Sequence, residues 1–452
     1  MKNPEDYPRV LILGHGFNST SGGGITLTNL FKGWDKDKIA VATGQTDFID
    51  ATICERYYHF GSLEDYWVFP FSLIPRHGKV SQPITVRGNS FSATVTSIAS
   101  TDPPETPARK NFYRAVKFFG AEDILRRLCL SPQFLQWVAD FKPEVIYTQL
   151  ASLNLIRLVT QLTPVTNAAI AIHMMDDWHS TLYRRGILSP YLRWRMNVEF
   201  RQLLKRAGAL MGISQKMCDA FQSRYARNFL PFHNSLDLSA WMPAQKNAWK
   251  ASTPFRFVYT GRIGKANAAS LRDLGDTIAE LNATGHSCRL DIFTPDHHTA
   301  FSQTFHRPGM VTLCPPIPYP NVPALLANAD TLILPLDFDA ESIEFARYSM
   351  PTKTAEYMIS GTPTLVYAPA EMAVAEYART GQWGYVVSER NKDALKRAMV
   401  ELMENQSLRE RLGRRAQTLA IQNHDARNVR EAFRQALADA ANRRSSKTSL
   451  AS

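Results

Sequence analysis

A lysine and a glutamate lie one helical turn apart in the stretch PTKTAEYMISGTP, which begins at Pro351. Pro351 suits the first position of a helix and Gly361 suits the position just after its end, so the stretch predicts a short helix followed by a strand over 364–367. An exposed ion pair between Lys353 and Glu356 would contribute only about 0.2–0.5 kcal/mol. So small a gain leaves room for a second use of this helix face.

Two further cations stand in YTGRIGKANAASL, residues 259–271, where Arg262 and Lys265 precede a predicted helix over 268–282. Cations beside the positive end of a helix dipole are unfavourable unless an anion joins them. A diphosphate group would account for both side chains. The alternative is a pair of solvated loop cations.

Three glycines, Gly22, Gly23 and Gly24, stand directly before a predicted helix in the loop GHGFNSTSGGG. Residues without Cβ let a substrate approach the backbone, and the helix N–H groups then point at an anion. A flexible turn is the alternative. The GHG at the start of the loop is weak evidence for a dinucleotide site, because a serine replaces the third glycine of that motif.

Two acidic motifs raise the question of a metal. HMMDDWHS (173–180) follows a predicted strand, where ligands collect in open α/β sheets, and offers His173, Asp176, Asp177 and His179. A polar strand end with helix-capping aspartates is the alternative, and His173 alone contacting a substrate hydroxyl is a third. DFD (337–339) resembles a DxD motif, in which two carboxylates bind a metal ion, although three letters recur by chance.

The segment YRRGILSPYLRWRMNVEFRQLLKR (183–206) is basic with interleaved aromatic residues. At about 1 kcal/mol for each basic residue near an anionic bilayer, it would suffice to hold the protein on a membrane. A solvated helix face explains the same pattern.

Composition sets the broad class. The chain has 452 residues, a net charge of +11 and five scattered cysteines that form neither a disulfide framework nor a zinc pattern, so we expect a cytoplasmic protein. The positive charge favours an anionic partner. No apolar run is long enough to span a membrane and the N-terminus has no signal core. The basic residues are dispersed, so we expect no nucleic-acid partner.

The chain repeats a β-loop-α pattern in each half. Strands are predicted at 10–13, 39–43, 145–149, 168–174 and 209–214, and a second series at 255–261, 289–293, 331–336, 364–368 and 384–388. Continuous apolar strands alternating with helices predict parallel sheets covered on both faces. We therefore predict an α/β fold with two Rossmann-like domains, at 1–245 and 246–440, the second ending in helices, and a disordered basic tail at 441–452.

With these segments in order, the sequence resembles the GT-B glycosyltransferases, and within them the GT4-like enzymes that build bacterial surface polysaccharides and glycolipids. The likeness spans nearly the whole chain. It is carried by the glycine loop, the strand-end His173, GISQKMCDAFQSRY (212–225), FHNSLD (232–237), YTGRIG and PTKTAEYMISGTP. The last of these is the most specific motif.

The resemblance implies two domains facing across a cleft, with the acceptor in the first and a nucleotide-activated sugar in the second. Arg262, with Lys265, would neutralise the donor diphosphate, and Lys353 with its helix N-terminus would hold the phosphate region. The catalytic residues implied are His173, which would contact the sugar, Arg262, and Glu356, which would bind the ribose diol. The donor-binding residues implied are Gly22, Gly23, Gly24, Arg262, Lys265, Ser349, Thr352, Lys353 and Glu356.

We therefore expect a retaining, metal-independent glycosyltransferase without a cofactor, which moves a sugar from a nucleotide diphosphate sugar to a glycan or lipid-linked acceptor. An anionic membrane surface is a further expected partner. One departure keeps other functions open: many GT4 enzymes have a sugar-contacting glutamate eight residues before the conserved one, and Tyr348 stands there. The alternatives are a nucleotide-sugar 2-epimerase and a catalytically silent GT-B subunit that binds nucleotide sugar or supports a partner.

Overall fold

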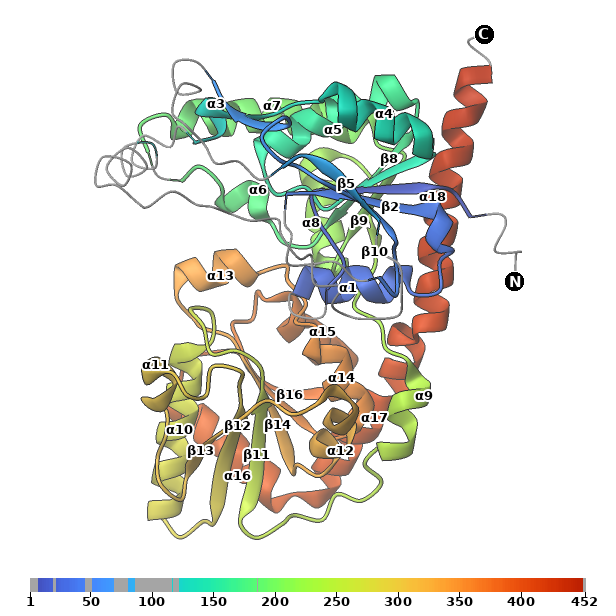
Figure 1. Cartoon of the computed structure of the whole chain (residues 1–452). Coiled ribbons are helices and arrows are strands. Elements are labelled where there is room, and N and C mark those ends of the chain that lie inside the picture. The colour runs from blue at the N-terminus through green and yellow to red at the C-terminus, as the bar shows by residue number, and fades with distance from the viewer. Residues whose placement is uncertain are drawn as a thin grey trace. The chain divides into compact units, whose positions relative to one another are not determined.

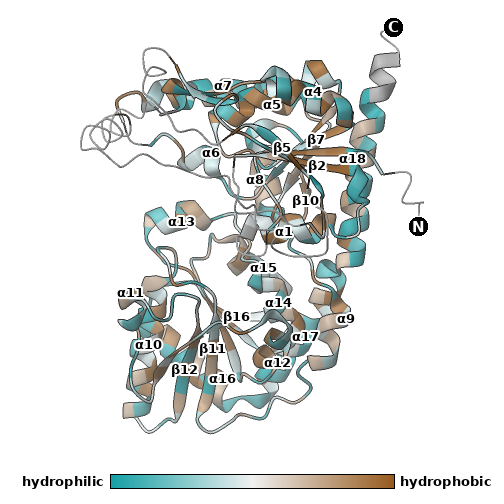
Figure 2. Cartoon of the chain, in the orientation of Figure 1, coloured by the Kyte–Doolittle hydropathy of each residue, from teal (hydrophilic) through white to brown (hydrophobic). Residues whose placement is uncertain are grey.

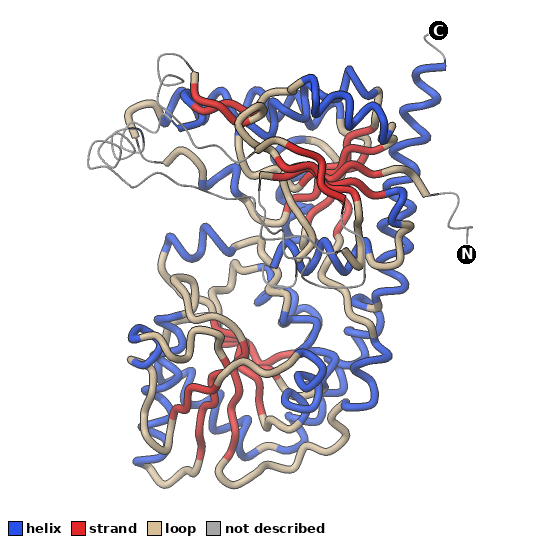
Figure 3. Tube along the Cα trace, viewed as in Figure 1, coloured by secondary structure: helices blue, strands red, loops and turns tan. Residues whose placement is uncertain are grey.

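The computed structural model describes residues 7–18, 22–44, 51–68, 80–85, 116, 122–184 and 186–449. The chain divides into two compact units. Unit 1 comprises residues 1–232 and 430–452, and unit 2 comprises residues 233–429. Each unit has one main sheet with helices on both sides, as the tube trace in Figure 3 shows.

The main sheet of unit 1 has eight strands in the order β10-β9-β8-β7-β1-β2-β3-β5. All neighbouring pairs are parallel except β3–β5. Its strands are β1 (Val10–Leu13), β2 (Ile39–Thr43), β3 (Arg56–His59), β5 (Gln82–Thr85), β7 (Val145–Thr148), β8 (Ala169–Met174), β9 (Ala209–Gly212) and β10 (Leu230–Pro231). The central strands are buried along their length and apolar, as Figure 2 shows, which agrees with a parallel sheet covered on both faces.

Helices cover both faces of this sheet. Figure 1 shows α4, α5 and α7 along one face and α1 and α8 on the other. The helices are α1 (Gly22–Phe31), η2 (Lys36–Lys38), α3 (Glu122–Leu125), α4 (Pro132–Phe141), α5 (Leu153–Thr166), α6 (Trp178–Thr181), α7 (Ser189–Arg206) and α8 (Gln215–Tyr225). A small antiparallel pair is formed by β4 (Asp65–Trp67) and β6 (Arg126–Leu128).

The sheet of unit 2 has six parallel strands in the order β13-β12-β11-β14-β15-β16. The strands are β11 (Phe255–Thr260), β12 (Cys288–Phe293), β13 (Val311–Cys314), β14 (Thr331–Pro335), β15 (Thr364–Tyr367) and β16 (Gly384–Val387). The order reverses direction between β11 and β14, which is the topological switch point of a doubly wound sheet. Both predicted Rossmann-like sheets are therefore confirmed.

The helices of unit 2 connect these strands and cover both faces. They are α9 (Leu238–Trp241), η4 (Met242–Ala244), α10 (Ala268–Ala283), α11 (Ala300–Gln303), η5 (Tyr319–Asn321), α12 (Val322–Ala327), α13 (Ala340–Ala346), α14 (Lys353–Ser360), α15 (Ala373–Gly381), α16 (Lys392–Glu404) and α17 (Gln406–His424). The helix predicted from Pro351 is α14. It begins two residues later than expected and ends, as expected, at Gly361, whose φ of 75° is left-handed.

Unit 2 begins earlier than the sequence suggested, at His233 and not at residue 246. The polar residues on either side of the predicted boundary, Gln245 and Lys246, are bonded into unit 2. Gln245 donates from Nε2 to the carbonyl oxygen of Ile359 at 3.0 Å. The Lys246 ammonium donates to two carbonyl oxygens at the end of α12 and just after it, at 3.0 and 2.8 Å. Polar residues therefore marked a docked segment here and not a domain boundary.

The C-terminal segment also differs from the predicted domain end at 440 and tail at 441–452. Residues 441–449 are the last part of α18 (Ala426–Ser449), and from Arg430 onward the chain belongs to unit 1. Phe433 packs edge-to-face on Phe31, Tyr147 and Phe232, with ring centroids 5.2–5.8 Å apart. This aromatic contact completes the core of unit 1. The basic residues after 440 had suggested a solvated tail, because the apolar residues that anchor the helix lie earlier in it.

Helix α14 packs against α17, and the backbone of Gly413 in α17 comes close to that of Gly361, just after α14. A Cβ built on Gly413 would lie 2.1 Å from the carbonyl oxygen of Gly361 and 2.4 Å from the indole nitrogen of Trp249. That indole nitrogen donates to the same carbonyl oxygen at 2.8 Å. Only glycine at position 413 allows this close approach, so the packed position of α14 against α17 depends on Gly413.

We predict that Gly413→Ala lowers the free energy of unfolding by about 1–3 kcal/mol, because the added methyl group overfills a packed site. Denaturant unfolding followed by circular dichroism measures the change. Gly264→Ala is the matched control, since a Cβ there meets no atom within 4 Å. Equal stability of the two variants would contradict the packing argument.

Candidate active site

The switch point of unit 2 brings together two of the sequence motifs. The loop of residues 261–267 leaves the carboxyl end of β11, and α14 follows the neighbouring strand β14 by way of α13. Ligands of open α/β sheets bind at this edge and at this point of the strand order. The hydroxyl group of Tyr357 in α14 accepts a hydrogen bond from the backbone N–H of Thr260 at 3.0 Å, which ties the helix to the strand end.

The loop after β11 has a defined conformation. The Tyr259 hydroxyl donates to the carbonyl oxygen of Arg262 at 2.8 Å, and Asn267 Nδ2 donates to the same hydroxyl at 2.8 Å. Asn267 Oδ1 accepts from the N–H of Gly264 at 2.9 Å. The backbone that carries Arg262 is therefore fixed before any ligand binds.

The side chain of Lys353 occupies the space that a side chain at position 261 would need. A Cβ built on Gly261 would lie 2.6 Å from Lys353 Nζ, and its φ of 136° disfavours other residues. The ammonium group lies 4.1 Å from the centre of the Tyr259 ring, which is a cation–π contact. The glycine of YTGRIG thus admits the lysine of PTKTAEY to the site.

Lys353 has no carboxylate partner in an ion pair among the residues that the structure describes. Burial lowers the pKa of its ammonium group to about 7, and the negative charge of Glu356 opposes this shift without cancelling it. The simple alternative from the sequence, an intrahelical Lys353–Glu356 ion pair, is therefore not formed. An anion bound here would restore the charged form of the lysine.

Glu356 lies one turn further along α14. Burial raises the pKa of its carboxyl group to about 7, against a hydrogen bond from Tyr319 and the charge of Lys353, which both lower it. Tyr319 belongs to η5 and packs edge-to-face on Trp241, with ring centroids 6.3 Å apart. Burial thus works against the charged form of both side chains, so a ligand that pairs with them would restore both charges.

The start of α14 is positioned by the segment FHNSLD. Asn234 Nδ2 donates to the carbonyl oxygen of Thr352 at 3.1 Å, and the carbonyl oxygen of Asn234 is bonded to His424 Nδ1 at 3.0 Å. The side chain of Thr352, the N-cap residue, makes no cap hydrogen bond. The N–H of Ser349 is bonded to the carbonyl of Ala346 at 3.0 Å. Ser349 and Thr352 thus lie at the approach to α14, and their contact with a donor stays a prediction.

Arg262 and Lys265 are both exposed, at opposite ends of the loop. The Arg262 side chain is 70% exposed, and among the described residues its one ion-pair neighbour is the carboxylate of Asp296, 3.9 Å away. It is free to move toward an anion, and it follows directly on Gly261, over which Lys353 Nζ lies. Lys265 is anchored through its backbone, whose carbonyl accepts from Ser342 Oγ at 3.2 Å. The structure therefore brings Arg262 near Lys353 and leaves Lys265 without a defined role.

The aspartates of DFD serve as helix caps. Asp337 accepts from the N–H groups of Ala269 and Ser270 at the start of α10, at 3.1 and 2.7 Å. Asp339 accepts from the N–H of Ser342 at 3.0 Å and caps α13. Both carboxylates have structural partners, which accounts for the motif without a metal.

The acidic residues of HMMDDWHS are likewise engaged. Asp177 makes a two-pronged ion pair with Arg224 at 3.0 Å and accepts from Ser180 at 2.7 Å. His179 packs within an aromatic cluster, 5.0 Å from Phe200. In the described part of the chain no three His, Cys, Asp or Glu residues lie close enough to hold a metal ion.

His173 lies near the end of β8 but inside the core of unit 1. Its side chain is fully buried, Nδ1 is bonded to the Tyr147 hydroxyl at 2.8 Å, and the Phe232 ring is 6.4 Å away. Burial lowers the pKa of the imidazole to about 3, so the ring is neutral at physiological pH. A contact with a sugar requires the imidazole to become exposed, and that role stays a prediction.

The glycines of unit 1 form the first turn of α1, which begins at Gly22 and so includes residues that we placed in the loop. A Cβ on Gly24 would lie 2.0 Å from the Asn18 side-chain amide, and one on Gly23 would lie 3.2 Å from Gln149 Oε1. Close packing against polar side chains thus accounts for two of the glycines. A donor contact at these positions stays a prediction.

Sequence reasoning missed Tyr259, Tyr319 and Asn234. Tyr259 read as one more apolar residue of a strand. Tyr319 lies in PIPYPNVP, where proline spacing masks any periodic signal. Asn234 belonged to a motif that we quoted, but its bond to the start of α14 joins residues 118 positions apart. Only the folded chain reveals these contacts.

Comparisons with known proteins agree with this geometry. Residues 254–405, all within unit 2, match the sequence model of the family described as Glycosyl transferases group 1. Sucrose-phosphate synthase from Thermosynechococcus elongatus has a similar structure, with a TM-score of 0.57 and 14% identity over 94% of this chain and 97% of that one. HepE of Anabaena, in complex with UDP and glucose, gives a TM-score of 0.57 and 12% identity over 95% of this chain and 99% of HepE.

A third similar structure is WaaG, a glycosyltransferase involved in lipopolysaccharide biosynthesis, with a TM-score of 0.53 and 13% identity over 95% of this chain and 99% of WaaG. No curated protein sequence matches the chain. At these identities the structures establish the GT-B fold. The resemblance to GT-B glycosyltransferases is confirmed, by fold for the whole chain and by family match for residues 254–405.

The shifted pKa values predict that affinity for a nucleotide diphosphate sugar peaks near pH 7. A bound diphosphate raises the pKa of Lys353 above 7. The contribution of Lys353 to affinity is therefore complete below pH 7, and its loss lowers the affinity by roughly tenfold between pH 7 and 8.5. Ribose hydroxyls favour the ionised form of Glu356, so affinity is also lost as the pH falls through 7. Isothermal titration calorimetry across pH 5.5–9 measures the profile, because the sugar diphosphate itself does not titrate there.

Two variants separate the limbs of this profile. Lys353→Ala should remove the alkaline limb and Glu356→Gln the acid limb, the latter with a loss of affinity of about tenfold. A profile that both substitutions leave unchanged would show that neither side chain faces the donor.

Proposed function

We propose that this chain is a GT4-like glycosyltransferase that moves a hexose from a nucleotide diphosphate sugar to a glycan or lipid-linked acceptor. The reaction retains the configuration at the anomeric carbon. The observation that carries the proposal is the Lys353 ammonium group. It is partly dehydrated, lacks an ion-pair partner among the described residues and lies at the switch point beside the start of α14. The family match covers this same segment.

The reaction breaks the bond between the anomeric carbon and a phosphate oxygen, so negative charge grows on the departing diphosphate. Lys353, the exposed Arg262 and the free N–H groups of the first turn of α14 would stabilise that charge, which is the main electrostatic task of such a site. Glu356, held by Tyr319, would accept hydrogen bonds from the ribose hydroxyls. Neither a metal nor a cofactor is part of the proposal, because fixed cations perform the electrostatic role.

The HepE structures, solved with UDP and with UDP-glucose, support a uridine nucleotide sugar as the first donor class to test. The involvement of WaaG in lipopolysaccharide biosynthesis supports a place in surface polysaccharide or glycolipid synthesis. Two alternatives keep the same donor site: a 2-epimerase, and a silent subunit, for which Tyr348 in place of the usual glutamate is the supporting observation.

Radiolabelled UDP-glucose, offered with lipid extract as acceptor, should give labelled glycan or lipid, or slow hydrolysis to free glucose, and both should continue in EDTA. Loss of turnover in EDTA that Mn²⁺ or Mg²⁺ restores would contradict the metal-independent chemistry. Conversion to an epimeric nucleotide sugar would identify the 2-epimerase. Binding without any turnover would identify the silent subunit.

We further propose that α7 associates with an anionic membrane, at the cytoplasmic face. Two apolar side chains of α7 are exposed one turn apart, Tyr191 and Trp194, with exposures of 50% and 57%, and Ile187 in the turn before the helix is 66% exposed. The opposite face of α7, which includes Leu192 and Phe200, is buried in unit 1. Exposed apolar side chains flanked by arginines are the pattern of an interfacial helix. Among the described residues no helix is long and apolar enough to span a bilayer.

Vesicles that contain phosphatidylglycerol should co-sediment with the protein, less so as salt rises, and the variant Arg193→Glu/Trp194→Ser should bind several-fold more weakly. Arg193 is chosen because Arg195 is already paired with Glu199 at 2.7 Å. Arg397→Glu on unit 2 is the control for net charge. Equal binding of the variant and the wild-type protein would leave α7 as a solvated helix face.

A further inference from the structure

A concave basic site lies in unit 1 at the amino ends of β8, β9 and β10, the sheet edge opposite the strand ends near His173. Its volume is about 740 Å³. We call it the basic pocket, and it is formed by the ends of α5 and α7, the segments that lead into the three strands, and α18. Its polar and charged lining residues are Thr163, Lys205, Arg206, Arg227, Asn228, Asp439, Asn442, Arg443 and Arg444.

The lining is strongly cationic. Five of these side chains carry a positive charge, and Asp439 is the single carboxylate. No ion pair joins a carboxylate to Lys205, Arg206 or Arg443 in the described part of the chain. Like charges gathered in a concave surface raise the local potential and attract an anion. The pocket therefore has a charge that the protein does not neutralise.

Two of the guanidinium groups are held in place by neutral partners. Arg443 Nη2 donates to the carbonyl oxygen of Gly208 at 2.9 Å. Arg227 donates to the carbonyl oxygens of Lys205 and Ala207 at 3.2 and 3.1 Å. Carbonyl partners orient these groups and leave their charge intact. Each guanidinium retains further N–H donors, which suit the oxygens of a phosphate group.

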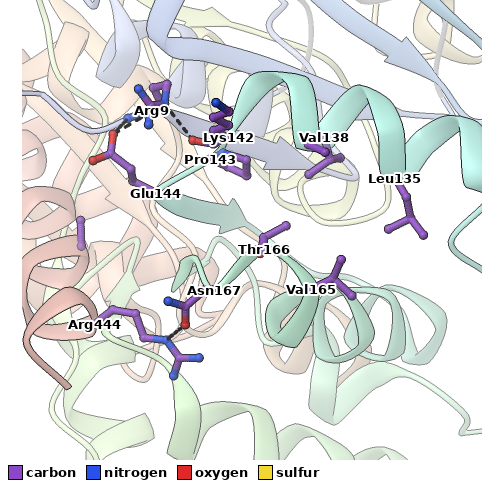
Figure 4. Close-up of a pocket in the computed structure, with 12 residues that line it drawn as sticks. Arg9, Leu135, Val138, Lys142, Pro143, Glu144, Val165, Thr166, Asn167 and Arg444 are labelled. Carbon is purple, nitrogen blue, oxygen red and sulfur yellow. Dashed lines mark hydrogen bonds and ion pairs between the residues drawn. The ribbon is translucent and has the colours of Figure 1, made fainter. Parts of the chain in front are cut away.

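A second pocket of about 400 Å³ adjoins the first and shares Arg444 with it. Figure 4 shows this pocket, which we call the apolar-walled pocket after the side formed by Leu135 and Val138 from α4 and Val165 from α5. Arg9, Lys142 and Glu144 also line it. On the other side Arg444 donates to Asn167 Oδ1 at 3.2 Å. Arg9 and Glu144 face each other at 3.9 Å, so the two charges largely offset one another here. The two adjoining pockets therefore match a molecule with an anionic group and an organic part that has both polar and apolar atoms.

We propose that the basic pocket binds a phosphate group, and that the apolar-walled pocket receives the organic part attached to it. This site is separate from the donor site in unit 2 and does not depend on the transferase function. Nucleic acid is a poorer match, because neither pocket has an aromatic side chain in its lining on which bases would stack. The phosphate has two sources, a soluble phosphate ester or a lipid headgroup.

Titration calorimetry with two probes that share one headgroup tests the proposal and separates the sources. Glycerol 3-phosphate represents the soluble ester, and dihexanoyl phosphatidic acid, kept below its micelle concentration, represents the lipid. The pocket variant is Lys205→Gln/Arg206→Gln. Both side chains are exposed, and neither makes a hydrogen bond or ion pair with another described residue. The matched control is Arg397→Gln/Arg411→Gln, exposed cations of unit 2 that line neither pocket. Circular dichroism checks the fold, and Lys205→Gln alone replaces the double variant if that one unfolds.

The pocket variant should lose about tenfold or more in affinity for both probes, while the charge control and Lys353→Ala bind them as the wild-type protein does. Tighter binding of phosphatidic acid than of glycerol 3-phosphate, reduced by Val165→Asp at an exposed position of the pocket wall, identifies a lipid headgroup; equal affinities identify a soluble ester. Equal binding by the pocket variant and the charge control overturns the proposal. Loss of binding in Lys353→Ala also overturns it, because the probes would then occupy the donor site.

Discussion

The candidate active site of unit 2 depends on one interaction: an ammonium group held against an aromatic face and a glycine backbone, with no ion-pair partner among the described residues. Lys353 occupies this position because Gly261 has no side chain and Tyr259 offers a ring at 4.1 Å. Burial without a counter-ion lowers the pKa of the lysine to about 7. An anionic ligand restores the charge, so the energy that unpaired burial costs the free protein favours donor binding.

The rest of unit 2 keeps α14 in the position that this interaction needs. From one side Asn234 bonds to Thr352 at the start of the helix. From the other side Trp249 and Gly413 pack against Gly361, the residue that ends it. The segment around the predicted domain boundary, with Asn234 and Trp249, and the helix with Gly413 thus hold the site in place. A short helix with little stability of its own acquires a fixed position through its neighbours.

Unit 1 distributes its chemistry over two opposite edges of one sheet. At the carboxyl ends of its strands lie the glycines of α1 and the buried His173. At the amino ends, cations from α7 and α18 line the basic pocket. The C-terminal helix contributes both to the core, through Phe433, and to this pocket, through Arg443 and Arg444. Part of the positive charge of the chain is therefore concentrated in one concave site, and the rest is dispersed.

The sequence by itself determined the two parallel sheets, the strand positions and the short helix with Lys353 and Glu356, because apolar periodicity, proline and glycine act over a few neighbouring residues. It did not determine the unit boundaries, since polar side chains at Gln245 and Lys246 look the same whether they meet water or buried carbonyl groups. Nor could it separate a site from a core, as at His173, because exposure depends on distant residues. Only tertiary structure decided that the lysine lies over Gly261 without an ion-pair partner among the described residues, and that scattered arginines converge on one pocket.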